Sequence, residues 1–221
     1  IHLNRAMNDG VALNAQTDLL PICGMDEHMD TDTFLQILAN ETGEKPEDIL
    51  CFDLSVYHYA EPVRTGFSGD MFMAPRIDNI SSVQACLTGL IEANPSDGIS
   101  VAVLFDHEEI GSRSKNGANG NLLSYTLERI CNAINISREN FLQSLVHSYY
   151  LSLDVAHAIH PAHPEKSDIT SAMPLNRGFA IKASAKHAYC SDDDMTGVIL
   201  QLAARQHIAC QQNHMRNDYP G

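Results

Sequence analysis

ISVAVLFDHEEIGS, at residues 99–112, is the stretch that decides the predicted fold. Its apolar run over 99–105 is typical of a strand that is buried on both faces of a sheet. Asp106, Glu108 and Glu109 follow this run directly. Ligands of open α/β sheets bind beyond the carboxyl ends of the strands. We therefore expect a functional site at this acidic turn, although a solvated turn without function would have the same composition.

The chain around this stretch alternates between helical patterns and short apolar runs. Such alternation is typical of βαβ units. We expect an α/β fold with a mostly parallel sheet flanked by helices, as in a catalytic domain. The predicted helices cover residues 78–93, about 121–134, 137 towards 149, and 192–211, and the predicted strands cover 99–105, 151–155 and 178–182.

The N-terminal third has a different pattern. Residues 31–42 have apolar side chains at helical spacing, whereas 19–22 and the alternating run 49–59 are typical of strands. The pattern changes at Gly66 and Gly69. We therefore place a domain boundary after residue 66, with one domain over 1–66 and the other over 67–221.

Composition narrows the possible functions. The 221 residues include 14 Lys and Arg against 28 Asp and Glu, which gives a net charge of −14, and 44% are hydrophobic. This content excludes a disordered chain. So few basic residues argue against nucleic acid as a partner, and apolar runs far shorter than the ~20 residues of a membrane span argue against a membrane. The acidity suits metal ions or cationic ligands.

The chain opens on IHLNR, without an initiator Met. We expect it to be an internal part of a longer protein without a secretory signal. Its six cysteines are scattered and form no Cys-x-x-Cys pair. This usage favours free thiols in a reducing compartment, so we expect a cytoplasmic protein.

Two further carboxylates stand where function is expected. Asp78 precedes a predicted helix, where it would also serve as an N-cap. Asp154 ends an apolar run, a place where Asp is unusual unless it is paired or bound to metal. Several carboxylates of this kind suit a two-metal site. For the three histidines of the motif HAIHPAH (157–163) we expect supporting or surface roles. The proline of the motif prevents a regular helix that would place all three on one face.

Together these segments resemble the aspartyl aminopeptidase family of zinc aminopeptidases, which also contains the yeast vacuolar aminopeptidase. The matching motifs keep their order and spacing over nearly the whole chain. They are APRIDN (74–79), DHEEIGS (106–112) with NGA (116–118), SLDVAHAIHP (152–161), and GFAIK (178–182) followed by Tyr189.

The resemblance implies a two-zinc exopeptidase that releases N-terminal residues, acidic ones preferred, from peptides. By motif match Asp78 would bridge two Zn²⁺ ions, Glu109 would bind one of them and Asp154 the other. Glu108 would be the general base, a role that suits a carboxylate beside a metal-bound water.

The resemblance also assigns residues outside the metal site. Residues 1–66 would be part of a β-rich dimerisation domain, from which His2 reaches the active site of a neighbouring subunit. Lys182 and Tyr189 would line the substrate pocket. The family assembles from dimers into dodecamers, so the resemblance implies self-association.

Two histidine ligands of the family pattern have no counterpart in this sequence. Two alternatives therefore stay open: a non-catalytic oligomerisation or binding module, and a two-metal deacylase on the same architecture. Specificity for neutral N-terminal residues, as in the vacuolar branch, also stays open.

Overall fold

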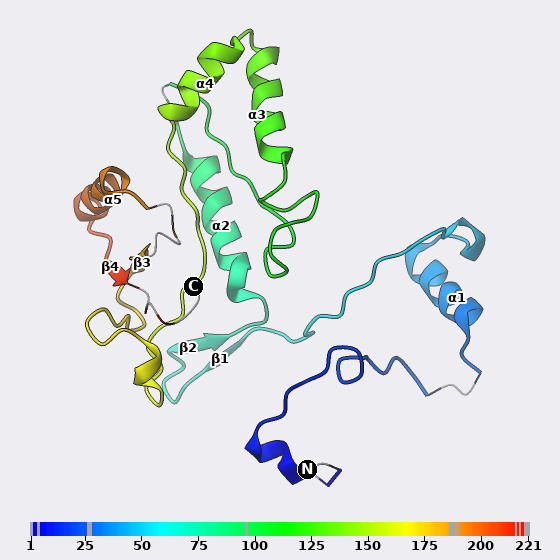
Figure 1. Cartoon of the computed structure of the whole chain (residues 1–221). Helices are drawn as coiled ribbons and strands as arrows, with labels where there is room; N and C mark the ends of the chain where they lie inside the picture. The colour runs from blue at the N-terminus through cyan, green and yellow to red at the C-terminus, as the bar shows by residue number, and fades with distance from the viewer. Residues whose placement is uncertain are drawn as a thin grey trace. The chain divides into compact units, whose positions relative to one another are not determined.

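The computed structural model of the chain is shown in Figure 1. It describes residues 2–3, 5–25, 28–95, 97–185, 189, 191–214, 216 and 218. The chain divides into two units, Ile1–Pro75 and Arg76–Gly221. The predicted division of roles between a dimerisation domain and a catalytic domain remains a prediction.

In the first unit, the described residues form one α-helix and one β-hairpin. Helix α1 (Thr31–Thr42) has the predicted bounds, because the Asp30 side chain accepts a hydrogen bond from the Thr33 N–H and Gly43 ends the helix in a left-handed conformation. Strands β1 (Val63–Thr65) and β2 (Met71–Met73) pair antiparallel. The short 3-10 helices η1 (Arg5–Asp9) and η2 (Pro46–Asp48) also lie in this unit.

The second unit begins with three helices that agree with the prediction. They are α2 (Ile77–Glu92), α3 (Leu122–Ala133) and α4 (Arg138–Val146). Helices α3 and α4 form an antiparallel hairpin (Figure 1) in which Cys131 and Phe141 are buried. Ser137 caps α4, and Arg138 bonds Glu128 of α3 at 3.1 Å.

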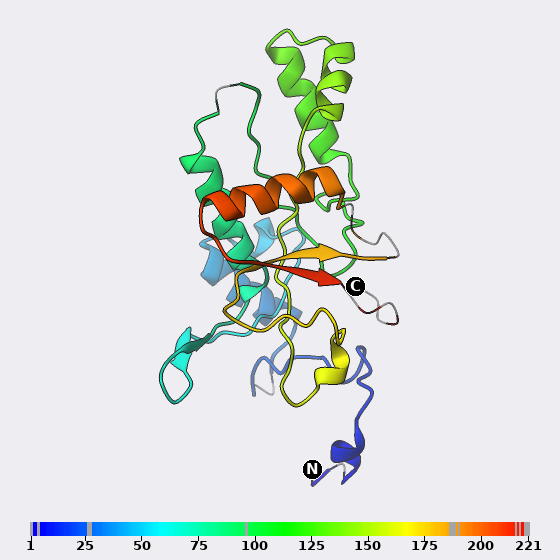
Figure 2. The same ribbon diagram turned by 90° about the vertical axis from the view of Figure 1, so that its left-hand side faces the viewer.

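The second unit ends in a βαβ arrangement. Strand β3 (Phe179–Ala183), predicted as 178–182, pairs in parallel with β4 (Cys210–His214), and α5 (Asp193–Arg205) connects them and lies along the pair (Figure 2). Gly178 enters β3 with φ 93°, and a Cβ atom there would lie 1.9 Å from the Ala209 carbonyl oxygen. Between α4 and β3 lies the 3-10 helix η3 (Pro164–Lys166).

The predicted helix over 192–211 is too long. Helix α5 ends at Arg205, His207 turns the chain with φ 55°, and the last two predicted positions, 210 and 211, belong to β4. The left-handed turn ends the helical hydrogen bonding, so residues from 210 onward are free to pair with β3.

The fold class is confirmed in part. The residues that the structure describes form helices and two small sheets of two strands each, one of them parallel, rather than one large sheet. The predicted strands over 19–22, 49–59, 99–105 and 151–155 are not strands in it. A strand needs a neighbour that completes its hydrogen-bond ladder, and none of the described residues provides a ladder for these runs. Ile99 and Leu151 are accordingly about half exposed, at 51% and 57%.

Two further expectations from the sequence concern membrane spans and cysteine thiols. Within the described residues, none of the helices combines the length and the apolar character that crossing a membrane requires. The described cysteines, Cys23, Cys51, Cys86, Cys131 and Cys210, are free thiols, while Cys190 lies outside the described residues.

Candidate functional site

Glu108 and Glu109 lie on a tight exposed turn that follows the apolar run 99–105. Backbone hydrogen bonds close the turn: the Gly111 N–H donates to the Glu108 carbonyl at 2.8 Å, and the Ser112 N–H donates to the His107 carbonyl at 2.9 Å. These two hydrogen bonds fix the backbone of the turn, and the side chains of Glu108 and Glu109 are exposed to solvent.

A hydrogen-bonded loop supports this turn. His107 Nδ1 lies 2.6 Å from the Ser114 hydroxyl, and its Nε2 lies 3.6 Å from Asp106 Oδ2. The Asp106 N–H donates to the Asn116 carbonyl at 3.2 Å. At Gly117 a Cβ atom would lie 2.2 Å from the Ser112 carbonyl oxygen, so this close approach requires glycine.

Asp78 lies in the first turn of α2 but does not cap it. The N-cap is Arg76, with φ 58°, and Asp78 has non-helical backbone angles (φ −82°, ψ 113°). The alternative of an N-cap role for Asp78 is therefore wrong. The carboxylate is exposed instead of being used by the helix start.

Asp154, Lys182 and Tyr189 are the three predicted site residues that the structure brings together. The Lys182 ammonium forms an ion pair with Asp154 Oδ2 and lies 5.6 Å from the centroid of the Tyr189 ring. The Val155 N–H donates to Asp154 Oδ1 at 2.7 Å. The Ser191 hydroxyl donates to the Lys182 carbonyl at 2.9 Å.

The surroundings of Asp154 act on its acidity in two directions. Partial burial raises its pKa, while the hydrogen bonds from the Lys182 ammonium and the Val155 N–H, with the positive charge of Lys182, lower it. The lowering effects prevail, and the pKa of Asp154 lies below its ordinary value. Asp154 is therefore an anion at neutral pH, and its counter-ion is a lysine.

Within the part of the chain that the structure describes, Asp78, Glu108 and Glu109 are not grouped with Asp154 as metal-ligating side chains. His2 is an exposed residue of the first unit, so its role at a subunit boundary remains a prediction. In the histidine motif, the rings of His160 and His163 lie 5.2 Å apart, and His163 Nδ1 lies 3.3 Å from Glu165 Oε1.

A metal site requires several ligands that converge on one point. Among the described residues, no three His, Cys, Asp or Glu side chains are grouped so that they would hold an ion. Asp78, Glu109 and Asp154 are thus not assembled as a zinc site, and Asp154 is engaged by Lys182. The described residues do not fit zinc as they are arranged here.

The structure also adds residues that the sequence did not indicate. Ser114 bonds the imidazole of His107, and Ser191 holds the backbone of Lys182. Both are serines in irregular segments, seven and nine residues from their partners. No periodicity or motif spacing distinguishes them from other surface serines.

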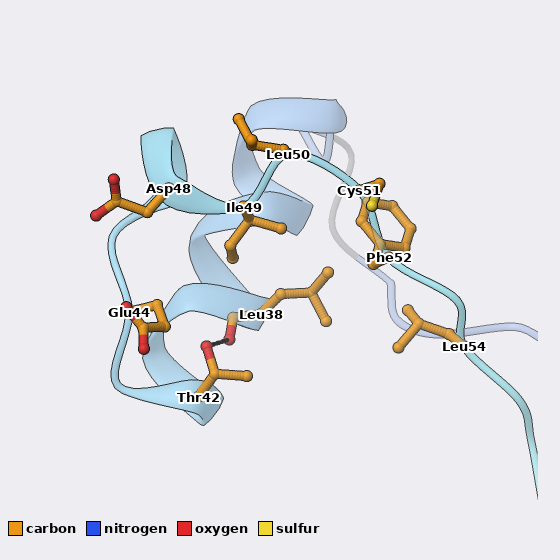
Figure 3. Close-up of a pocket in the computed structure, with 9 residues that line it drawn as sticks. All are labelled: Leu38, Thr42, Glu44, Asp48, Ile49, Leu50, Cys51, Phe52 and Leu54. Atoms are coloured by element: carbon orange, nitrogen blue, oxygen red, sulfur yellow. Dashed lines mark hydrogen bonds between the residues drawn. The ribbon is translucent and has the colours of Figure 1, made fainter. Parts of the chain in front are cut away.

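A hollow of about 460 Å³ lies in the first unit, away in sequence from the predicted site residues. Figure 3 shows α1 and the extended segment after η2 on its sides, with Leu38, Ile49, Phe52 and Leu54 among the lining residues. The acidic residues of its described lining are Glu44 and Asp48. The predicted catalytic, metal and substrate residues lie elsewhere in the chain.

Comparisons with known proteins identify relatives over the full sequence. The family profile described as "Aminopeptidase I zinc metalloprotease (M18)" matches residues 1–221. The "Probable M18 family aminopeptidase 2" of Clostridium novyi (strain NT) is 38% identical over 223 residues, which cover 100% of this chain and 52% of that protein. The chain thus spans about half the length of such relatives.

Solved structures have the same fold. The crystal structure of prApe1 has a TM-score of 0.86 at 22% identity, over 100% of this chain and 50% of that one. The structure of the S. cerevisiae mApe1 dodecamer has a TM-score of 0.72 at 26% identity, over 82% of this chain and 43% of that one. The arrangement of elements in this chain is therefore one that occurs within longer, solved proteins.

Proposed function

This chain belongs to the aminopeptidase I zinc metalloprotease (M18) family, and on that basis we propose that it is part of a zinc aminopeptidase that releases N-terminal residues, acidic ones preferred, from peptides. The observation that carries the proposal is the family match over residues 1–221. The curated relatives are about twice as long as this chain, so the proposal concerns the whole enzyme of which this chain would be a part.

We assign roles to this chain's residues on the same basis. Asp78, Glu109 and Asp154 are the proposed zinc ligands of the assembled enzyme. Glu108 is the proposed general base, since its exposed carboxylate is free to take a proton and to return it to a leaving amine. The hydrogen-bonded turn from His107 to Ser112 holds the backbone of Glu108 in place.

Substrate recognition is assigned to Lys182 and Tyr189. The Lys182 ammonium, which lies beside the Tyr189 ring, suits a negatively charged side chain of the substrate. His2 is proposed to complete the active site of a second subunit. Self-association is proposed from the mApe1 dodecamer, and a cytoplasmic location from the free thiols of the described cysteines.

The test is hydrolysis of Asp- and Leu-aminoacyl reporter substrates by the purified, zinc-supplemented protein, with N-acetyl-Asp reporter as the control. Cleavage that requires the free amine and is faster for Asp than for Leu would support the proposal. Release of acetate from the acetylated reporter, without cleavage of the free-amine reporters, would indicate the deacylase instead.

A second function, a non-catalytic binding or oligomerisation module, has one observation in its favour. No group of three metal-ligating side chains exists among the described residues. A protein that forms oligomers, binds no zinc and cleaves neither reporter would favour this module over the enzyme.

A further inference from the structure

The connection between α4 and β3, residues 147–178, contains η3 and is otherwise irregular. Side-chain hydrogen bonds tie its second half to β4. The Ser171 hydroxyl donates to the Gln212 carbonyl at 3.2 Å and accepts from the His214 N–H at 2.8 Å. A connection that is held by side chains rather than by a strand ladder has few bonds to break before it opens locally. We call this connection the strap.

The first half of the strap is joined to β3 instead. Asp154 Oδ2 forms the ion pair with Lys182 of β3, and Asp154 Oδ1 accepts the Val155 N–H at 2.7 Å. Further along the strap, the Ile159 N–H donates to the Met173 carbonyl at 2.8 Å and links the two halves. The strap is thus fastened to the parallel pair at separate places, at Asp154 on β3 and beyond residue 170 on β4.

Lys182 is the fixed partner of this ion pair. Its backbone pairs with Asn213 of β4, and its carbonyl accepts the Ser191 hydroxyl at 2.9 Å. Its ammonium lies 5.6 Å from the Tyr189 ring centroid, within the range of a cation–π contact. Its side chain is 22% exposed, against 55% for Asp154. Movement of the strap, rather than of β3, is therefore what would separate the two charges.

We propose that the ion pair of Asp154 with Lys182 is a latch, which fastens the strap to β3 and keeps the Lys182 ammonium from negatively charged ligands. While the latch is closed, the Asp154 carboxylate occupies the ammonium that a substrate carboxylate would bind. When the latch opens, the strap moves at Asp154 and stays bonded to β4 at Ser171. The consequence for recognition rests on the substrate role of Lys182 in the proposed function.

Amide hydrogen exchange of the whole chain tests the latch. Asp154→Asn removes the negative charge but keeps an oxygen that can accept the Val155 N–H, and Lys182→Met removes the positive charge but keeps the apolar stem. Both variants should accelerate exchange of the Val155 and Ile159 N–H groups about twofold to fivefold, as the modest energy of a partly exposed ion pair implies. The double variant should be no faster than either single one, because both changes remove the same contact.

Two controls separate the latch from a general loosening of the unit. The His214 N–H, which is bonded to Ser171, should exchange as in the wild type. Asp168→Asn makes the same substitution within the strap, at a carboxylate that accepts the Thr170 N–H at 2.7 Å, and should leave the two accelerated amides unchanged. Unchanged exchange of these amides in the latch variants would overturn the proposal, as would an equal acceleration at His214.

A second readout follows Lys182 itself. Acetic anhydride labels accessible amines, and mass spectrometry gives the extent of labelling at Lys182 relative to Lys45, an exposed lysine of the other unit. Asp154→Asn should increase labelling at Lys182 severalfold, and constant labelling would overturn the claim that the latch covers this ammonium.

Neither readout uses peptide cleavage, so the latch and the proposed activity fail separately. A responsive latch in a protein that cleaves no reporter would remove the activity and leave the latch. Cleavage by a protein whose latch variants exchange and label as the wild type does would remove the latch and leave the activity.

Discussion

The loop that carries Glu108 and Glu109 is held by the hydrogen bond between His107 Nδ1 and the Ser114 hydroxyl, at 2.6 Å. Ser114→Ala removes this bond. A hydrogen bond contributes about 0.5–1.5 kcal/mol net, and because His107 is 41% exposed we expect the lower half of that range. The loop should then open about two- to fivefold more often, since the same free energy is lost from its closed state.

Amide hydrogen exchange measures this opening residue by residue. The N–H groups of Asp106, Ser112 and Asn119 bond carbonyls within the loop, at 3.2, 2.9 and 3.1 Å. Their exchange should accelerate by that factor in Ser114→Ala. Ser148→Ala is the matched control, because its hydroxyl makes an equally short bond, 2.6 Å to the Ser144 carbonyl, outside this loop. Equal exchange of the three amides in Ser114→Ala and wild type would refute the role of the bond.

Three more predictions concern catalysis, packing and acidity. Glu108→Gln should keep the zinc content of the active enzyme and lower kcat by about 10²–10⁴, as elemental analysis and reporter hydrolysis would show; near-normal turnover would remove Glu108 as the base. Phe141→Ala, at a residue 6% exposed, should lower the free energy of urea unfolding by about 3–5 kcal/mol, and Leu142→Ala, 45% exposed, by about 1–2 kcal/mol; equal losses would contradict the packing of α3 on α4. Hydrogen bonds from the Thr33 backbone and hydroxyl lower the pKa of Asp30 in the folded chain. The Asp30 carboxylate therefore stabilises α1 fully above the ordinary Asp pKa of about 3.9. This stabilisation is lost as the pH falls through the lowered pKa of the folded state. Circular dichroism of Asp30→Ala should therefore differ most from wild type at neutral pH, and the difference should shrink in acid, where the Asp30 carboxylate is protonated; a constant difference would contradict this.

Local sequence signals predicted the helices well. Asp30 and Gly43 delimit α1, and Ser137 begins α4, because capping depends on residues within one turn of the helix end. The end of α5 was wrong by about one and a half turns, since the left-handed turn at His207 has no signal as clear as a glycine.

The strands were predicted less well, for a physical reason. A run such as 99–105 has strand composition, but strand formation depends on a partner distant in sequence. The described residues pair only β1 with β2 and β3 with β4. Strand β3 was predicted over 178–182, whereas β4, with its polar sequence CQQNH, has no apolar alternation to indicate it.

The candidate site was predictable as a set of residues and not as an arrangement. The apolar runs before them and the order of the motifs identified Glu108 and Asp154 as candidate site residues. The pairing of Asp154 with Lys182, 28 residues away, depends on where β3 lies, and no local pattern contains that information.

Release of an acidic residue from the free N-terminus of a peptide tests the central claim most directly. The measurement is the initial rate of cleavage of an Asp-aminoacyl reporter and of its N-acetylated form by the zinc-supplemented protein. The account predicts cleavage of the free-amine reporter, none of the acetylated one, and loss of the rate on chelation. Equal rates for the two reporters, or no cleavage by a protein that contains zinc, would contradict it.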